Sequence, residues 1–176
     1  ESALVFPSGF QANLGLIQAL VGAGDEVYVD RFSHASLVDG ARLSGAKLRV
    51  YPHADADRLA ELLARPFGGK RLVVTDSYFS MDGDRAPLER LIEACERAGA
   101  MLLVDEAHAF GVYGSNGRGL LHEVGLKNGK KSLAGRVTAV VGTLSKSLGS
   151  QGGFVCGSAE FIEYLVNKAR TFIYTT

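Results

Sequence analysis

Short apolar runs of strand length alternate along the chain with segments in which apolar residues recur every three or four positions. In residues 86–98, the i, i+3, i+4, i+7 positions of one helix face are Leu88, Leu91, Ile92 and Cys95. Further helices are predicted over 35–43, 55–64 and 159–170, and strands over 26–30, 47–51, 71–76, 100–104, 137–141 and 153–156. This alternation predicts an α/β layer fold with a largely parallel sheet. The Gly- and Lys-rich segment 127–136 is predicted to be a polar surface loop.

Polar residues follow three of the predicted strands where each apolar run ends. The segments after strands 71–76, 100–104 and 137–141 are Ser77-Tyr78-Phe79-Ser80, Asp105-Glu106-Ala107-His108 and Gly142-Thr143-Leu144-Ser145-Lys146. Because the carboxyl ends of parallel strands meet at one edge of a sheet, these side chains are expected to converge there. The sequence therefore predicts a site with carboxylates, an imidazole, hydroxyls and a lysine.

Lys146 is the candidate nucleophile of this site. It follows a buried strand and is flanked by Gly142 and Gly149, where crowded backbone is expected to remove water from the ammonium group. Loss of water lowers the pKa of a lysine and frees its amine for Schiff-base chemistry. The alternative is a lysine that extends from a glycine-rich turn into solvent. In the same way, Asp105 could cap a helix and Ser80 could be a turn residue.

Composition limits the class of protein. The 176 residues fit one domain, and 19 basic residues balance 19 acidic ones, so no nucleic-acid surface or polybasic membrane anchor is expected. No run of about 18 apolar residues predicts a membrane span. Two cysteines without ligand spacing favour reduced thiols in a cytoplasmic protein. The 22 glycines among 176 residues are a larger share than the roughly 7% of an average chain. They indicate tight turns and close backbone contacts.

Other motifs are incomplete or absent. Residues 104–108 match the DEAH box of helicase-type ATPases, but the GxxxxGK[ST] phosphate loop that this function needs does not occur. GxGxxG, GxSxG and HExxH are also missing, so the sequence does not indicate a dinucleotide fold, a hydrolase elbow or a zincin site. Schiff-base chemistry remains the strongest interpretation.

Five segments, spread over almost the whole chain, occur in the same order as in a known enzyme family: 6–13 (FPSGFQAN), 33–36 (SHAS), 79–84 (FSMDGD), 105–108 (DEAH) and 142–149 (GTLSKSLG). With them the chain resembles the α-oxoamine synthases, pyridoxal 5'-phosphate (PLP) enzymes of fold type I. The resemblance implies a three-layer α/β/α large domain with a mostly parallel central sheet. It also implies PLP as cofactor and no metal.

The resemblance assigns catalytic roles to three residues. Lys146 is implied to bind the cofactor aldehyde and then to act as general base. Asp105 is implied to pair with the pyridine nitrogen. His34 is implied to stack on the cofactor ring.

Further cofactor contacts follow from the same resemblance. His108 and Ser80 are implied to form hydrogen bonds with the phenolic oxygen of the ring. The backbone N–H groups of Gly9 and Phe10 are implied to hold the phosphate at the start of a helix that runs toward Leu20. Thr143 is implied to add a hydroxyl to that phosphate.

Within the family, segments 84–88 and 170–174 favour the branch that condenses L-alanine with pimeloyl-CoA or a pimeloyl-carrier protein to 8-amino-7-oxononanoate, CoA and CO₂. The sister branches remain possible: the glycine C-acetyltransferase, 5-aminolevulinate synthase and serine palmitoyltransferase types. A non-catalytic cofactor-domain fragment or regulatory relative also remains possible. The family implies a homodimer, with Thr175 or Thr176 near the neighbouring subunit's phosphate. Residues 1–176 are expected to be the PLP-binding large domain without the family's N-terminal segment and C-terminal small domain, and inactive alone.

Overall fold

A seven-stranded sheet forms the centre of the molecule in the computed structural model, which describes residues 2–129 and 132–175. Its order is β1-β9-β8-β7-β4-β2-β3. The bounds are β1 (Ser2–Phe6), β2 (Glu26–Asp30), β3 (Lys47–Tyr51), β4 (Arg71–Asp76), β7 (Met101–Asp105), β8 (Ala139–Thr143) and β9 (Gly153–Gly157). Strands β3, β2, β4, β7 and β8 are parallel, and β9 is antiparallel to both β8 and β1. The predicted, largely parallel sheet is confirmed, with β1 as an additional edge strand.

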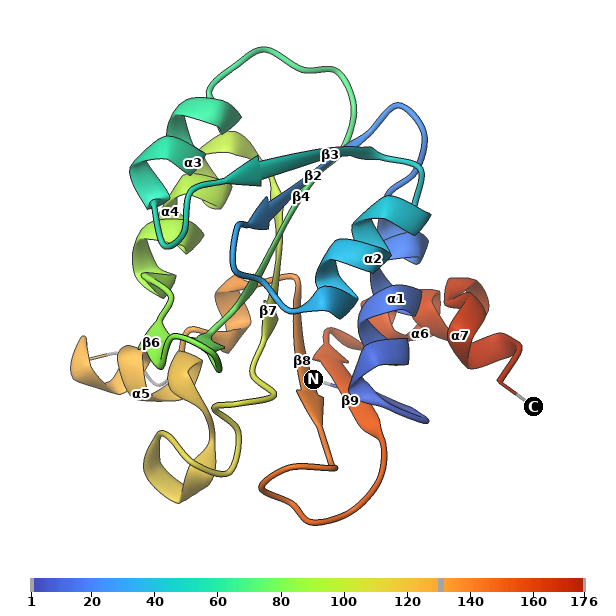
Figure 1. Cartoon of the computed structure of the whole chain (residues 1–176), viewed down its shortest axis with the longest axis vertical. Helices are drawn as coiled ribbons and strands as arrows, with labels where there is room; N and C mark the ends of the chain where they lie inside the picture. The colour runs from blue at the N-terminus through green and yellow to red at the C-terminus, as the bar shows by residue number, and fades with distance from the viewer. Residues whose placement is uncertain (1, 130–131, 176) are drawn as a thin grey trace.

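Helices cover both faces of the sheet (Figure 1). One face carries α1 (Gly9–Leu20), α2 (Ala35–Leu43), α6 (Ala159–Lys168) and α7 (Arg170–Ile173). The other carries α3 (Ala56–Leu63), α4 (Leu88–Ala98) and α5 (Leu120–Lys127). This arrangement is the predicted three-layer α/β/α domain. The predicted helix 159–170 ends earlier, at Lys168, and a separate short helix follows.

Each central strand sends side chains into two cores. In β2, Val27 and Val29 are fully buried against the α1 and α2 side, whereas Tyr28 is fully buried on the α3 and α4 side. In β4, Val74 and Val73 divide in the same way. Strands buried on both faces are expected to be continuously apolar, which is the pattern in the sequence.

A small hairpin projects from the end of β4. Its strands are β5 (Tyr78–Phe79) and β6 (Asp84–Arg85), and Gly83 in the turn between them has a φ of 73°. This positive φ favours glycine. Two-residue strands have no periodicity, so the sequence did not predict them.

The predicted surface loop 127–136 is partly ordered structure. Its first residue ends α5, and Ala134–Arg136 form a 3₁₀ turn. Leu133 is fully buried, so the segment is not wholly a surface loop; residues 130 and 131 lie outside the described part. Thr175 is exposed after α7, and Thr176 also lies outside the described residues.

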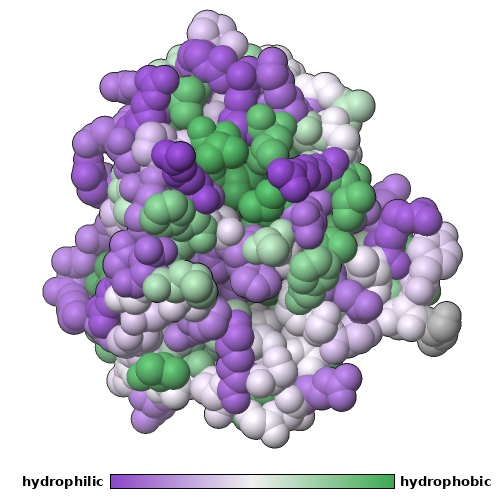
Figure 2. Space-filling view, viewed as in Figure 1, coloured by the Kyte–Doolittle hydropathy of each residue, from purple (hydrophilic) through white to green (hydrophobic). Residues whose placement is uncertain are grey.

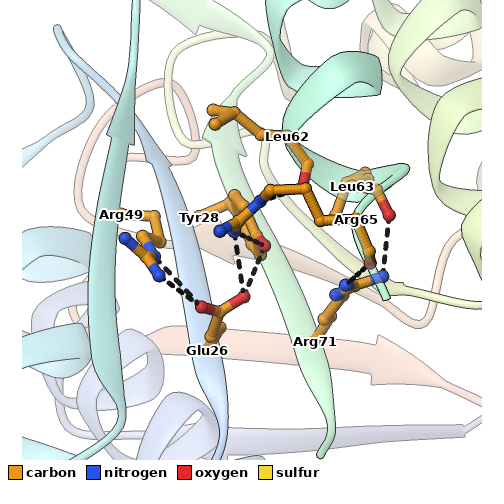
Figure 3. Close-up of polar contacts among 7 residues, drawn as sticks. All are labelled: Glu26, Tyr28, Arg49, Leu62, Leu63, Arg65 and Arg71. Atoms are coloured by element: carbon orange, nitrogen blue, oxygen red, sulfur yellow. Dashed lines mark hydrogen bonds and ion pairs between the residues drawn. The ribbon is translucent and has the colours of Figure 1, made fainter. Parts of the chain in front are cut away.

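A polar network occupies the edge of the sheet where β2 begins (Figure 3). Glu26 Oε1 accepts hydrogen bonds from Arg49 Nε and Nη2 at 3.0 and 2.8 Å, and Glu26 Oε2 accepts one from the Tyr28 hydroxyl at 2.6 Å. Arg71 donates to the main-chain oxygens of Leu63 and Arg65 at the end of α3. These contacts join β2, β3 and α3 at the edge opposite the polar strand ends.

Hydrophobic side chains gather around β3 on the face shown in Figure 2. Val50 on this edge strand is 58% exposed. Among the described helices, none combines the length and apolar character needed to cross a membrane.

Candidate functional site

A cavity of about 220 Å³ lies at the carboxyl ends of β4, β7 and β8, beside the start of α1. Its lining residues are Ser8, Gly9, Phe10, Asn13, His34, Ser36, Asp76, Asp105, Ala107, His108, Thr143, Ser145 and Lys146. The structure thus brings together all the predicted site residues except Ser80. The cavity is smaller than the roughly 300–1,000 Å³ of a typical ligand pocket, so it suits a compact group.

Lys146 and His108 are in direct contact. Lys146 Nζ lies 2.8 Å from His108 Nε2. Burial and the charge of Lys146 lower the pKa of His108, so the imidazole is neutral at pH 7 and Nε2 can accept a hydrogen bond from Nζ. Lys146 itself is exposed, so the expected burial of its ammonium group was wrong. Gly149 has open space around it, whereas a Cβ at Gly142 would meet the Phe154 ring, and His108 supplies the polar contact of Lys146.

Asp105 is buried at the end of β7, with only 5% of the residue exposed. Its Oδ2 accepts a hydrogen bond of 2.7 Å from Asn13 Nδ2, and its Oδ1 accepts one of 2.8 Å from the Ala107 N–H. Two donors on opposite oxygens fix the plane of the carboxylate. Sequence reasoning missed Asn13; the available signal was a polar side chain among the apolar residues of a buried helix face.

A second carboxyl group, Asp76, lies next to Asp105. The two residues are register partners at the ends of β4 and β7. Burial, followed by the charge of Asp105, raises the pKa of Asp76 to about 7. Asp76 Oδ2 also accepts a hydrogen bond of 2.9 Å from the His34 N–H, which fastens the start of α2 to the end of β4. The sequence placed Asp76 at a strand end but assigned it no role.

The imidazole of His34 is oriented by its own helix. Nδ1 accepts the Ser36 N–H at 3.2 Å and lies 2.8 Å from Ser36 Oγ, so His34 acts as the N-cap of α2. Ser36 Oγ in turn accepts a hydrogen bond of 2.9 Å from Asn13 Nδ2. Asn13 therefore connects Asp105 with the residue that positions the His34 ring.

The first turn of α1 borders the same cavity. Ser8 caps the helix by accepting the Gln11 N–H at 3.2 Å. N–H groups in the first turn of a helix have no partner within the helix and attract anions. Gly153 brings β9 against this turn, because a Cβ atom there would lie 2.5 Å from the backbone nitrogen of Gly9.

The hydroxyl groups of Thr143 and Ser145 close this end of the cavity. Thr143 Oγ1 donates to the main-chain oxygen of Gly152 at 3.1 Å and lies 2.8 Å from Ser145 Oγ. Thr143 is 6% exposed, and a Cβ added at Gly9 would approach its Cβ to 3.4 Å. The predicted phosphate-binding residues therefore lie side by side in space.

Two residues of the predicted motifs lie away from the cavity lining. Ser80 is exposed in the β5–β6 turn, so its predicted contact stays a prediction. Glu106 is 2% exposed and accepts the Leu121 N–H at 2.9 Å at the start of α5, which gives it a structural place. Burial raises the pKa of Glu106 to about 7.

The fold and the cavity define a three-layer α/β/α domain with a lysine, two imidazoles and buried carboxylates at the carboxyl edge of its sheet. The family model described as aminotransferase class I and II matches residues 1–176. The chain belongs to this family.

Relatives within that family are similar over the full chain. The 8-amino-7-oxononanoate synthase of Alkalilimnicola ehrlichii is 54% identical over 176 residues, which are 100% of this chain and 44% of that protein. Serine palmitoyltransferase from S. paucimobilis, solved with a bound PLP–myriocin aldimine, has a TM-score of 0.89 and 38% identity, covering 97% of this chain and 42% of that one. The 8-amino-7-oxononanoate synthase of Francisella tularensis has a TM-score of 0.79 and 36% identity, covering 99% and 48%.

These similarities confirm the predicted resemblance to the α-oxoamine synthases and the fold of that group. The chain spans less than half the length of each of these relatives.

Proposed function

We propose that this chain is the cofactor-binding large domain of a PLP-dependent acyltransferase of the α-oxoamine synthase type. The observation that carries the proposal is the contact of 2.8 Å between Lys146 Nζ and His108 Nε2 in the cavity that also holds Asp105. A lysine amine, a neutral imidazole and a fixed carboxylate at one strand edge form the donor and acceptor set that a pyridoxal ring requires.

The residues that line the cavity have the side-chain and backbone groups that PLP binding needs. Asn13 Oδ1 is buried without a hydrogen-bond partner among the described residues, so the cavity has an acceptor still to be satisfied. Gly9 and Phe10 would hold the phosphate with the first N–H groups of α1, and Thr143 would add its hydroxyl. Asp105 would hold the ring nitrogen, with His34 against the ring face.

When bound, PLP supplies an electron sink for the carbanion that remains when the α-proton of an amino acid is removed. Lys146 would bind the cofactor aldehyde through Nζ and then take that proton. His108 keeps Nζ oriented by accepting its hydrogen bond, and because the imidazole is neutral it adds no positive charge beside the amine. Ser80, in the hairpin turn that follows β4, would join His108 at the phenolic oxygen.

The proposed substrates are supported by the name of one relative. L-alanine and pimeloyl-CoA or pimeloyl-carrier protein are proposed, because the Alkalilimnicola relative is named 8-amino-7-oxononanoate synthase. The cavity of about 220 Å³ is assigned to the cofactor, and the acyl chain would bind beyond it. A homodimer in the cytoplasm with substrate contacts from the rest of the protein completes the proposal.

The test uses the full-length protein with added PLP. The wild type should develop an absorption band at the edge of the visible range, and borohydride should then fix a pyridoxyl group on the peptide that contains Lys146. Lys146→Ala should lose both signals and lower turnover by roughly three orders of magnitude or more. Lys168→Ala, at an exposed position at the end of α6, is the matched control. An unchanged band in Lys146→Ala would contradict the assignment.

The amino acid and acyl chain are tested separately. CoA release should depend on L-alanine and be fastest with the pimeloyl thioester. Release that is faster with serine and a long acyl-CoA would favour the serine palmitoyltransferase branch, which the S. paucimobilis structure represents. Cofactor binding without turnover would favour the non-catalytic relative.

A further inference from the structure

The imidazole of His53 lies between two carboxylates that belong to different segments. Nδ1 is 2.9 Å from Asp30 Oδ1 at the end of β2, and Nε2 is 2.8 Å from Asp84 Oδ2 in β6. The ring is stacked on Phe32, with centroids 4.5 Å apart, and meets Phe79 edge to face at 4.4 Å. Contacts of both nitrogens and of the ring with two phenylalanines fix the position of this side chain.

The hydrogen-bond partners determine the protonation of His53. Asp30 Oδ1 also accepts the Phe32 N–H at 2.9 Å, and Oδ2 accepts the Ala54 N–H at 2.8 Å. A carboxylate can only accept, so His53 Nδ1 must donate to it, and the contact of Nε2 with Asp84 requires a second proton. The imidazolium satisfies both carboxylates at once.

The charges around the ring agree with this assignment. Burial by itself lowers the pKa of His53, but the hydrogen bonds and charges of Asp30 and Asp84 outweigh it and raise the pKa above its ordinary value. These two carboxylates are the charged groups that act most strongly on the ring, and Phe32 and Phe79 are its aromatic contacts among the described residues. No group of three His, Cys, Asp or Glu among the described residues is arranged to hold a metal ion.

The Asp30 side of this bridge leads to the candidate site. The Ser33 N–H donates to the Asp30 main-chain oxygen at 3.0 Å, and His34, which lines the cavity, is the next residue. The carboxylate of Asp30, through Phe32 and Ala54, therefore holds the loop 31–34 against the segment that carries His53.

The Asp84 side leads to the hairpin turn. Asp84 pairs with Phe79 across the β5–β6 hairpin, and Ser80 follows Phe79 directly. Asp84 Oδ1 is buried without a hydrogen-bond partner among the described residues, so in that part of the chain the Asp84 carboxylate is hydrogen-bonded through Oδ2 to His53.

The opposite side of the same hairpin is attached elsewhere. Arg85 Nη1 donates to Glu123 Oε1 at 2.9 Å, and its guanidinium lies over the Tyr113 ring. The contacts of His53 with Asp84 and Phe79, by contrast, connect the hairpin to the loop before α2.

We propose that His53 is a positioning residue that holds the loop carrying His34 and the turn carrying Ser80 in a fixed relation to each other. The inference rests on the proposed function, in which His34 and Ser80 contact the cofactor from these two segments. The protonation of His53 and its hydrogen bonds to the two loops can be measured without the cofactor.

The first experiment measures His53 in the cofactor-free full-length protein. Ring-nitrogen NMR should show N–H protons at both Nδ1 and Nε2 at pH 6 and the loss of one of them as the pH rises through the His53 pKa. The protection factors of the amides in 31–34 and 80–84, which compare exchange with the intrinsic rate at each pH, should fall over the same pH range. A neutral His53 ring at pH 6 would overturn the proposal.

Two variants separate the bridge from general destabilisation. His53→Phe keeps an aromatic ring between Phe32 and Phe79 but cannot form either hydrogen bond. It should increase exchange in both segments by roughly tenfold or more, the factor expected for losing a hydrogen bond to a charged group. Asp84→Ala should increase exchange over 80–84 and leave 31–34 protected. His122→Phe, at a half-buried histidine on α5 whose Nε2 lies 2.9 Å from Ser115 Oγ, is the control.

The cofactor provides the second measurement. PLP should bind His53→Phe about tenfold more weakly than the wild type, and His122→Phe with wild-type affinity. Failure of the wild type to bind PLP would contradict the proposed function, while the exchange results would still decide the bridge. Exchange that stays unchanged in both segments of a folded His53→Phe protein would overturn the inference.

Discussion

The side-chain amide of Asn13 donates a hydrogen bond of 2.7 Å to Asp105 Oδ2, although the two residues are 92 positions apart in the chain. One is in the second turn of α1 and the other ends β7. The same amide nitrogen also donates to Ser36 Oγ at 2.9 Å. A single buried side chain therefore joins the helix that starts at the candidate phosphate site, the central carboxylate and the start of α2.

Replacing Asn13 with alanine should weaken both the fold and the site. The change leaves buried acceptors on Asp105 and Ser36 without their donor, which costs about 1–3 kcal/mol of unfolding free energy. PLP affinity should also fall, because the Asp105 carboxylate loses one of its two fixed donors. Urea unfolding and PLP titration measure the two effects.

Asn167→Ala is the matched control, because Asn167 is exposed on α6 and its side chain donates to the Glu163 main-chain oxygen one turn away. Its unfolding free energy should stay within about 0.5 kcal/mol of the wild type. Equal losses in the two variants would show that the Asn13 contacts carry no special weight.

Gly153→Ala tests the close approach of β9 to α1. The added Cβ would lie 2.5 Å from the nitrogen and 2.6 Å from the Cα of Gly9, and backbone atoms cannot move aside as a flexible side chain can. We expect a loss of about 1–3 kcal/mol in unfolding free energy, the usual cost of overpacking, and weaker phosphate binding at the displaced helix start. Gly135→Ala, where a Cβ meets nothing within 4 Å, should cause no loss. Wild-type stability in Gly153→Ala would refute the tight contact.

Glu106 should make stability depend on pH. Its pKa is raised from 4.5 to about 7, mainly by burial, so between these values the folded chain holds a proton that the unfolded chain releases. The free energy of unfolding is therefore highest below this window and falls as the pH rises through it. Asp76 acts in the same direction, with a pKa raised to about 7.

Glu106→Gln should flatten that fall, because the amide oxygen can still accept the Leu121 N–H without titrating. Thermal unfolding at intervals from pH 4.5 to pH 7.5 measures the slope. Glu163→Gln, at an exposed position on α6, should keep the wild-type slope. A Glu106→Gln slope equal to the wild type would mean that another group dominates the window.

The parts of the fold that the sequence predicted are those where local pattern and tertiary environment agree. Strands such as β4 are apolar because both faces are buried, and α4 has a regular apolar stripe. The edge strand β1 was missed because its partner, β9, lies at the other end of the chain. The hairpin β5–β6 was missed because its two-residue strands are too short to show a pattern.

The site shows the same division. Asp105, His108 and Lys146 were predicted because strand ends converge in a parallel sheet. Asn13 was not, since its role depends on a partner 92 positions away. The exposure of Lys146 could not be predicted from neighbouring glycines, because it depends on how the turn after β8 projects from the sheet.

Substitution of Glu26 should lower the stability of the fold without affecting the candidate site. It is 3% exposed and lies at the start of β2, at the sheet edge opposite the cavity, where Arg49, Arg65 and Tyr28 contact its carboxylate (Figure 3). Glu26→Gln leaves the arginines without their buried counter-charge and should lower the unfolding free energy by about 1–3 kcal/mol. Glu61→Gln breaks an exposed pair with Arg58 and should cost at most about 1 kcal/mol. PLP affinity should be unchanged in both variants, and a weaker affinity in Glu26→Gln would show that the two edges of the sheet are coupled.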